Sequence, residues 1–231
     1  MQQTMKYLCE NISGCVLGYT QSDEITLLLI DYKSMAQGAW FGYVKRKVET
    51  ISASMATMAF NKFYTDIVKE RVRKELKGCE TEADKKKVTD YYTKYARKCG
   101  KAMFDSRAWN MPEFEVINGF IWRQNDCVRN SIQSVAQANF SAKQLEHKNQ
   151  KELMDMLMLK KGVNWNDYPI YLKRGTCCVK VPQTYNEGTP DEFTRSKWVI
   201  DKEIPTFTKD RDYIEKRFKN IRTVTNKIDR K

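Results

Sequence analysis

The sequence predicts a mixed α/β fold in which a short antiparallel sheet is flanked by helices. The apolar run Ile25–Ile30 is only six residues long and is bounded by polar residues, which favours a buried strand over a helix. Between Ala39 and Lys77, apolar residues recur at the three- and four-residue spacing that is typical of a helix. The β-branched stretch Thr176–Val181 predicts a further strand.

The first predicted strand pair carries two adjacent acids between its strands. Cys15–Gly18 is predicted as the first strand, and the polar connection to Ile25 contains Asp23 and Glu24. Polymerase-like palms hold divalent metals at such strand ends, because hard cations prefer carboxylate oxygens and a rigid sheet fixes their positions. A polar hairpin turn with two solvated acids explains the same residues, so this stretch alone leaves both interpretations open.

Composition narrows the class of protein. The chain has 231 residues, and 41 Lys and Arg against 29 Asp and Glu give it a net charge of +12. Such an excess favours a polyanionic partner, nucleic acid or nucleotides, although surplus lysines that only solubilise the surface are the alternative. Seven cysteines without a Cys-x-x-Cys pair, and a single histidine, argue against a zinc site and against Ser-His-Asp or Cys-His catalysis.

The cysteine count and the N-terminal residues indicate the cellular compartment of the protein. The cysteine count is odd, and the N-terminus has no signal-peptide core. We therefore expect reduced thiols and a cytoplasmic location. No apolar stretch approaches the roughly 20 residues that cross a bilayer, so no membrane contact is expected.

The remaining elements follow from periodicity and turn signals. The helix at 39–77 is long enough to be two helices with a break near Asn61. Further helices are expected at 1–13, 113–137, 141–161 and 213–218, and further strands at 102–109 and 197–200. The last ten residues are expected to fray.

A basic excursion at about 78–100 is expected to project from the core as a helical hairpin or a loop. Residues 41–101 contain 16 Lys and Arg against 8 Asp and Glu. Each cation could displace counterions from a phosphate backbone. An exposed helix with solvated charge explains the same pattern, and the sequence does not choose between them.

A polar face is expected on the helix at 113–137. Arg123, Asp126, Arg129 and Asn130 fall within one or two helical turns, so they can present one surface. Ion pairs of the two arginines with Asp126 or Glu115 on the helix surface are the alternative.

Several motifs, taken in order, resemble the tRNA-His guanylyltransferases and their bacterial, archaeal and phage-type relatives. The resemblance covers nearly the whole chain to about Glu215. The motifs are Gly18-Tyr-Thr-Gln-Ser-Asp-Glu, Trp40-Phe, Phe104-Asp-Ser-Arg, Phe120-Ile-Trp-Arg-Gln-Asn-Asp, Gly162-Val-Asn-Trp-Asn, Lys173-Arg-Gly-Thr and Arg195-Ser-Lys-Trp.

The resemblance implies a polymerase-palm-like antiparallel sheet with flanking helices. It also implies 3′→5′ addition of nucleotides, G or templated nucleoside triphosphates, to the 5′ end of tRNA. Two Mg²⁺ ions, GTP or ATP as substrates and a homotetramer would follow. Asp23 matches a shared metal carboxylate and Glu24 the acid beside it. Ser22 and Lys47 match triphosphate contacts, and the tRNA or nucleotide contacts would be Arg123, Arg129, Asn130, Lys173 and Arg174.

Two departures qualify this expectation. Where members that add only G carry His-Ile-Asn-Asn, this chain has Val128-Arg129-Asn130-Ser131, which resembles the template-directed 5′-end repair enzymes. The family's first metal motif, an Asp-Gly-x-x-Phe-His strand, would lie before Met1 and is absent. The fold is therefore expected to lack its first palm strand, leaving a position beside the Cys15–Gly18 strand empty.

The missing carboxylate makes a catalytically impaired remnant that binds tRNA or nucleotide the alternative function. We expect residues 1–140 to form the palm-like core and 141–231 a C-terminal helix-plus-strand region, within one structural unit.

Overall fold

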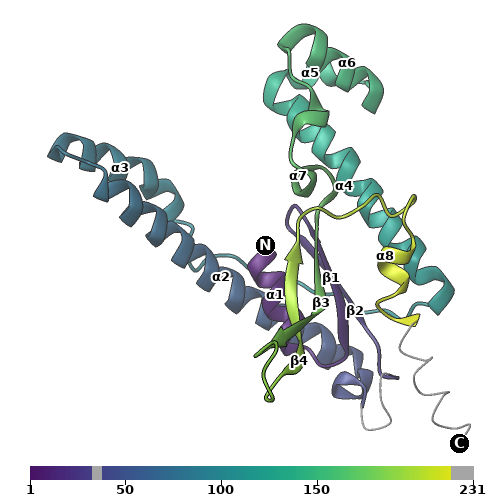
Figure 1. The fold of residues 1–231 in the computed structure, drawn as a ribbon. Helices are drawn as coiled ribbons and strands as arrows, with labels where there is room; N and C mark the ends of the chain where they lie inside the picture. The colour runs from purple at the N-terminus through teal and green to yellow at the C-terminus, as the bar shows by residue number, and fades with distance from the viewer. Residues whose placement is uncertain (33–37, 220–231) are drawn as a thin grey trace, which may run out of the picture.

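A four-stranded antiparallel sheet in the order β2-β1-β3-β4 forms the centre of the fold (Figure 1). The computed structural model describes residues 1–32 and 38–219. The strands are β1 (Cys15–Gln21), β2 (Glu24–Leu29), β3 (Thr176–Tyr185) and β4 (Phe193–Asp201). The predicted class, an antiparallel sheet with flanking helices, is confirmed.

The expectation of an empty position beside the first strand is wrong. β1 pairs with β2 on one side and with β3 on the other, so both of its edges are filled. Within the described residues, the open edges of the sheet belong to β2 and β4.

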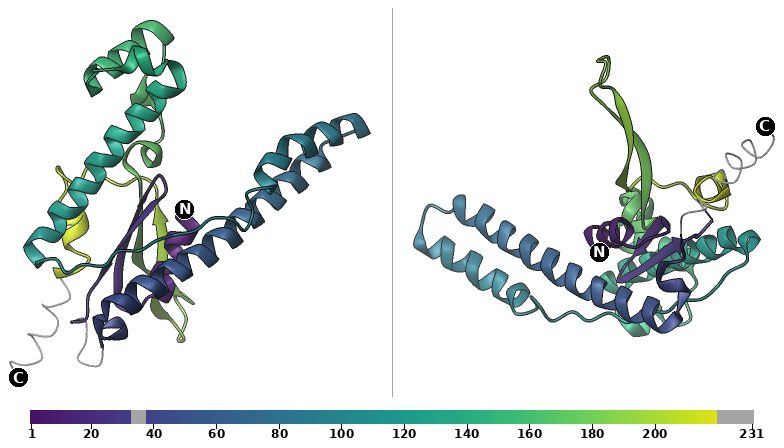
Figure 2. Two further views of the ribbon diagram at one scale, coloured as in Figure 1. Left: turned by 180° about the vertical axis from the view of Figure 1, so that it is seen from behind. Right: turned by 90° about the horizontal axis from the view of Figure 1, so that it is seen from below.

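Helices surround this sheet and extend well beyond it (Figure 2). None of the helices in the described residues is long and apolar enough to cross a membrane. They are α1 (Gln2–Asn11), α2 (Lys45–Lys77), α3 (Glu82–Ala96), α4 (Val116–Asn139), α5 (Ala142–Leu145), α6 (Gln150–Lys161), α7 (Ile170–Arg174) and α8 (Asp212–Glu215), with 3₁₀ turns η1 (Trp40–Tyr43), η2 (Glu113–Glu115) and η3 (Trp165–Asp167).

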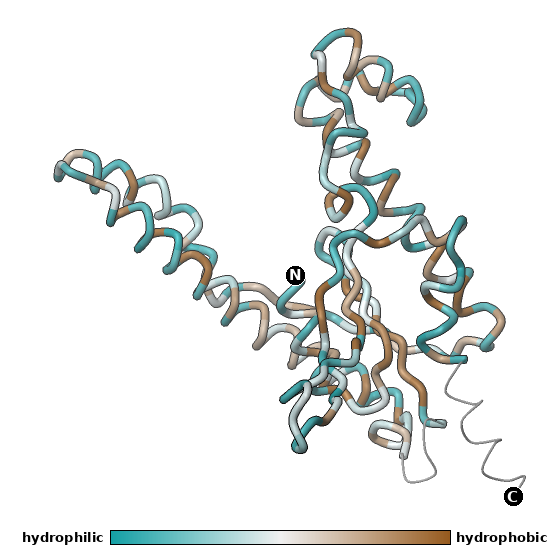
Figure 3. Tube along the Cα trace, viewed as in Figure 1, coloured by the Kyte–Doolittle hydropathy of each residue, from teal (hydrophilic) through white to brown (hydrophobic). Residues whose placement is uncertain are grey.

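Each face of the sheet packs against a different set of helices. On one face, Leu17 and Tyr19 of β1 join Phe120 of α4 and apolar residues near the C-terminal end of the described chain. On the other face, α1 and α2 pack against Cys178 and Trp198. Alternate side chains of a strand point to opposite faces, so the strands can contribute to both clusters. The hydrophobic residues of the strands are brown in Figure 3.

α2 and α3 form an antiparallel pair that projects from the sheet (Figures 1 and 2). The excursion predicted at about 78–100 therefore does project from the core, but it contains one helix, α3, that packs on α2, rather than both helices of a hairpin. The expected break near Asn61 is wrong, because α2 runs without interruption from Lys45 to Lys77. Asn61 instead binds a neighbouring segment. Its amide donates to the Ala102 carbonyl at 2.9 Å, and its Oδ1 accepts from the Ala102 N–H at 3.0 Å.

The strand predicted at 102–109 is wrong: the segment is extended but pairs with no other strand. Its backbone instead lies along α2, where the Phe104 N–H donates to Thr57 Oγ1 at 3.0 Å and the Ala108 N–H to Glu49 Oε1 at 2.9 Å. One side of this extended segment faces a helix, which produces the same alternating pattern as a strand in a sheet.

The single helix predicted at 141–161 is also wrong, because two helices occupy this stretch. Asn149 opens α6 with a capping box, in which the Asn149 N–H donates to Glu152 Oε2 at 2.8 Å and the Glu152 N–H donates to Asn149 Oδ1 at 3.1 Å. The strands predicted at 176–181 and 197–200 lie within β3 and β4. The helix predicted at 213–218 overlaps the shorter α8, and the last ten residues lie outside the described residues.

Gly175 is required by the junction between α7 and β3. Its φ of 83° and ψ of −165° define a conformation that is essentially restricted to glycine. A Cβ at Gly175 would also lie 2.6 Å from the Thr20 carbonyl oxygen, so backbone strain and a steric clash coincide there.

We expect Gly175→Ala to lower the free energy of unfolding by about 3 kcal/mol, from backbone strain together with the clash. Gly162→Ala is the matched control. Gly162 also has a positive φ, 64°, but no atom lies within 4 Å of an added Cβ, so about 1 kcal/mol is expected. Urea unfolding followed by circular dichroism measures both. Equal losses would contradict the close packing of Gly175 against β1.

Candidate functional site

The two acids that were singled out in the sequence lie at the turn between β1 and β2. Gln21 pairs with Glu24 in the strand register, which leaves Ser22 and Asp23 as the two turn residues. Ser22 has a φ of 47°, the left-handed conformation by which a two-residue connection reverses the chain. Ser22, Asp23 and Glu24 are all exposed, so this turn presents a hydroxyl and two carboxylates to solvent.

Glu24 connects the turn to α4. Its Oε2 accepts from Arg123 Nη1 at 3.0 Å and from Gln21 Nε2 at 3.1 Å. Arg123 therefore pairs with an acid of β2 rather than with Asp126 on its own helix or with Glu115 in the preceding η2. Its guanidinium also lies 4.9 Å from the ring centroid of Trp122.

Asp126 forms hydrogen bonds with the other polar residues of this helix face. Its carboxylate accepts from the Arg129 guanidinium, from Asn130 Nδ2 at 3.1 Å and from Gln21 Nε2 at 3.4 Å. The predicted polar face is therefore present and is joined to the β1–β2 turn. We call the whole set the turn–α4 cluster; it contains Gln21, Ser22, Asp23, Glu24, Arg123, Asp126, Arg129 and Asn130.

Gln21 lies at the centre of the turn–α4 cluster and is only 6% exposed. Its amide nitrogen faces two carboxylates, while its Oε1 is buried and has no hydrogen-bond partner. Reversing the amide would place Oε1 against both carboxylates, so the carboxylates determine its orientation. No role was predicted for Gln21; its place in the motif Gly18-Tyr-Thr-Gln-Ser-Asp-Glu, which contains the two acids, was the available signal.

The structure separates Lys47 from this cluster. β2 runs away from the turn over six residues, about 17 Å at the usual rise of a strand, before the chain reaches α2. Lys47 is exposed in the first turn of α2, at the opposite end of the sheet (Figures 1 and 2). The expected meeting of Lys47 with Asp23 at one triphosphate is therefore not supported.

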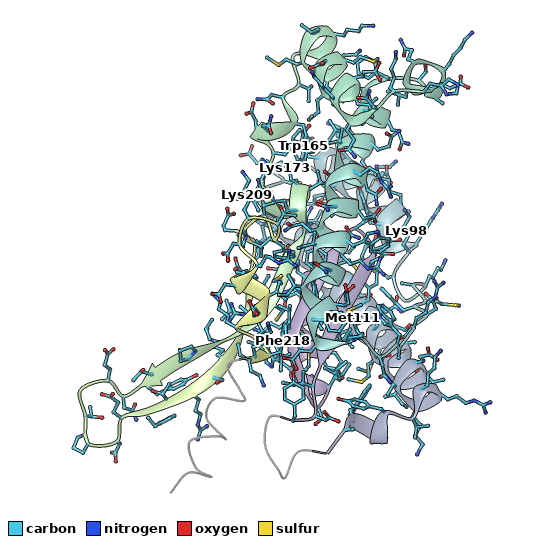
Figure 4. All side chains as sticks on the ribbon, turned by 90° about the vertical axis from the view of Figure 1, so that its right-hand side faces the viewer. Lys98, Met111, Trp165, Lys173, Lys209 and Phe218 are labelled. Carbon is cyan, nitrogen blue, oxygen red and sulfur yellow. The ribbon has the colours of Figure 1, made fainter. Side chains whose placement is uncertain are left out.

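Lys173 was expected to contact RNA but is only 9% exposed. Its ammonium donates to the Asn166 carbonyl and lies 5.5 Å from the Trp165 ring centroid (Figure 4). Trp165 Nε1 in turn donates to Ser131 Oγ at 3.1 Å, which ties this loop to α4. Lys173 therefore stabilises the loop. Arg174 is half-buried, and its carbonyl accepts from the Tyr19 hydroxyl at 2.7 Å.

The donor atoms at the turn suit a metal that arrives with a substrate. Residues 1–32 and 38–219 contain no group of three or more His, Cys, Asp or Glu side chains that could hold a metal. Mg²⁺, however, is commonly bound by one or two carboxylates together with substrate phosphates. Asp23 and Glu24 provide two adjacent carboxylates in the exposed turn. The residues thus fit a Mg²⁺–triphosphate complex rather than a preformed all-protein metal site.

Comparison with known proteins identifies the family to which the chain belongs. A family model described as tRNAHis guanylyltransferase matches residues 1–112. A bacterial tRNA(His) guanylyltransferase (Thg1)-like protein in complex with ATP is 38% identical, with 93% of this chain and 76% of that chain covered and a TM-score of 0.68. The same kind of bacterial protein in complex with GTP gives 35% identity, coverages of 93% and 74%, and a TM-score of 0.64.

A viral relative extends the comparison. Uncharacterized protein R259 of Acanthamoeba polyphaga mimivirus is 25% identical over 183 residues, which are 74% of this chain. The chain spans 57% of the length of that curated relative. Taken together, the family model and the bacterial structures show that the chain belongs to the tRNA-His guanylyltransferase family, whose members are nucleotidyltransferases.

We expect Gln21→Glu to destabilise the protein by about 2 kcal/mol at pH 7, because it adds a third carboxylate beside Glu24 and Asp126. The destabilisation should fade toward pH 4, where protonation of the introduced carboxyl group removes its charge. Gln21→Met, which removes the amide without adding charge, is the control and should show a smaller pH dependence, because only Glu24 and Asp126 then repel each other. Chemical unfolding at both pH values measures the effect, and a pH-independent loss in both variants would contradict it.

We expect Lys173→Met to lower the free energy of unfolding by about 1–2 kcal/mol, because the hydrogen bond to Asn166 is lost. The salt dependence of RNA binding should stay that of the unaltered protein. Arg174→Met, at the neighbouring half-buried position, should change stability by less than about 0.5 kcal/mol. A weaker salt dependence in Lys173→Met, measured by fluorescence anisotropy, would restore Lys173 as an RNA contact.

Proposed function

We propose that the protein is a 3′→5′ nucleotidyltransferase that adds nucleotides, G or templated nucleoside triphosphates, to the 5′ end of a tRNA. The observation that carries the proposal is the acid-tipped β1–β2 turn joined to the polar face of α4. It occurs in a chain 38% identical to a bacterial Thg1-like protein whose structure contains ATP. The net charge of +12 supports an RNA substrate.

In this proposal, the turn receives the triphosphate of GTP or ATP. Asp23 and Glu24 hold the accompanying Mg²⁺, which when bound neutralises phosphate charge and sharpens the nucleophile. The Ser22 hydroxyl is exposed beside them and donates to a phosphate oxygen. Gln21 and Arg123 keep Glu24 oriented toward the turn through their hydrogen bonds to Oε2.

The α4 side of the turn–α4 cluster binds the 5′ end of the RNA. Arg129 and Asn130 are both exposed and both bonded to Asp126, so their remaining donors are held in one direction. These donors suit the phosphates at the 5′ end of an RNA. Arg174 is a further contact in this proposal. A cytoplasmic location and a homotetramer complete it.

A binding function without turnover is the second candidate. One feature favours it: the Glu24 carboxylate, which would have to hold Mg²⁺, is already paired with Arg123. Such a protein would bind tRNA and nucleotide but release no pyrophosphate with any combination of nucleoside triphosphate and Mg²⁺.

We expect Asp23→Asn to reduce nucleotide addition to a 5′-truncated tRNA transcript at least 100-fold, and Glu24→Gln to reduce it by a similar factor. Asp191→Asn is the matched control, because Asp191 is an exposed acid in the connection between β3 and β4. Pyrophosphate release and extension of the labelled transcript measure activity.

A second measurement does not depend on activity. Titration calorimetry with GTP should show an affinity that rises with Mg²⁺ in the unaltered protein but not in Asp23→Asn. Full activity in Asp23→Asn would contradict the role of the turn. Mg²⁺-dependent GTP binding without pyrophosphate release in the unaltered protein would favour the binding-only candidate.

A further inference from the structure

Half of the net charge of the chain lies on a structure remote from the turn–α4 cluster. We define the α2–α3 arm as residues 62–101, the outer part of α2, all of α3 and the few residues after it. The arm contains 13 Lys and Arg against 7 Asp and Glu, an excess of six in a chain of net charge +12. Figures 2 and 3 show the arm leaving the sheet with a largely hydrophilic surface.

Internal contacts hold the two helices of the arm in a defined register. Tyr92 is buried between them, and its hydroxyl donates to Glu75 Oε1 at 2.6 Å. The Tyr64 hydroxyl donates to the Tyr95 carbonyl at 3.3 Å, nearer the base of the arm. Because the backbone is already ordered, a ligand bound along the arm would cost little conformational entropy.

Few cations of the arm form ion pairs with its acids. Its salt bridges within 4 Å are Lys85–Glu82 and Lys87–Asp84, both in the first turns of α3 at the outer end of the arm. Along α2, Lys69, Arg73 and Lys77 follow one another at four-residue spacing and are all exposed. Like charges at this spacing destabilise a helix, so this row is not explained by helix stability.

α3 adds cations and an exposed aromatic ring. Lys94 and Lys98 are exposed, and Lys94 Nζ lies 4.4 Å from the ring centroid of Tyr91. Tyr91 itself is 53% exposed and contacts the rings of Tyr92 and Tyr95. Cations that track a backbone, together with an exposed ring on which a base can stack, are the combination used to bind single-stranded nucleic acid segments.

We propose that the α2–α3 arm is a second RNA-binding surface, which holds the phosphate backbone of the RNA whose 5′ end lies at the turn. The identity of that RNA rests on the proposed function. α2 alone is 33 residues long, about 50 Å at the usual helical rise, and its outer end lies away from the sheet (Figures 1 and 2), so the arm contacts the RNA away from its 5′ end. A second copy of the arm is disfavoured as the occupant, because two such rows of cations would repel each other.

The test compares two triple variants that remove the same charge. Lys69→Gln/Arg73→Gln/Lys77→Gln alters the arm, and Lys143→Gln/Lys151→Gln/Lys160→Gln alters three exposed lysines of α5 and α6. Binding of a tRNA transcript is measured by fluorescence anisotropy over a series of salt concentrations, without nucleotide or Mg²⁺.

The arm variant should reduce the magnitude of the slope of log K against log salt by about 2–3, since each phosphate contact contributes about 0.7–0.9. The control should change it by less than 1. Tyr91→Ala should weaken binding about tenfold with an unchanged slope, because it removes stacking rather than charge. Thermal unfolding confirms that the variants are folded.

Equal slopes in the two triple variants would overturn the proposal, as would an unaltered protein that binds no RNA. A change in the mass measured by light scattering, with an unchanged slope, would instead make the arm an interface between copies of the chain. Kinetic measurements test the proposed function separately. Rates measured over a range of RNA concentrations should give the arm variant an unchanged kcat and a raised KM for RNA. Asp23→Asn should instead keep the RNA affinity and lose turnover.

Discussion

The amide group of Gln21 is the interaction on which the candidate site depends. Two carboxylates from different elements, Glu24 of β2 and Asp126 of α4, face the same amide nitrogen. Without a donor between them, the two like charges would push the β1–β2 turn away from α4. Because Gln21 is almost fully buried, this donor is held by the sheet itself, and Arg123 adds the positive charge that the pair of acids requires. The exposed position of Asp23 follows from this anchoring of the turn.

Local sequence patterns predicted the elements of this site well but not their contacts. The acids of the turn, the polar face of α4 and the strand after Lys173 all follow from short-range periodicity and turn chemistry. The partner of Arg123 does not, because Glu24 lies 99 residues away and the helix itself offers Asp126 at a closer spacing. Lys173 shows the same limit, since its charge faces inward toward a loop carbonyl that a sequence pattern does not reveal.

Two of the incorrect structural predictions concern the same contact, between α2 and the extended segment at 102–109. The alternation at 102–109 indicates an extended chain with one covered side, but the covering element is α2 rather than a second strand. The expected break near Asn61 likewise treats a polar residue in a helix as a weak point. Its amide in fact serves the backbone of that same extended segment. Periodicity indicates which side of a segment is covered, but only the tertiary structure shows which element covers it.

The charges of the molecule divide between two places that would act differently on a bound RNA. In the turn–α4 cluster, each arginine is matched by a carboxylate, so this site contributes little net attraction until a substrate rearranges it. On the α2–α3 arm, most cations are unmatched, and they would attract a bound RNA equally before and during the proposed reaction. Attraction that is the same in the ground state and the transition state improves binding without speeding the chemical step. In the proposed function, the arm therefore suits the capture of a substrate, and discrimination and chemistry would be left to the few residues around Gln21.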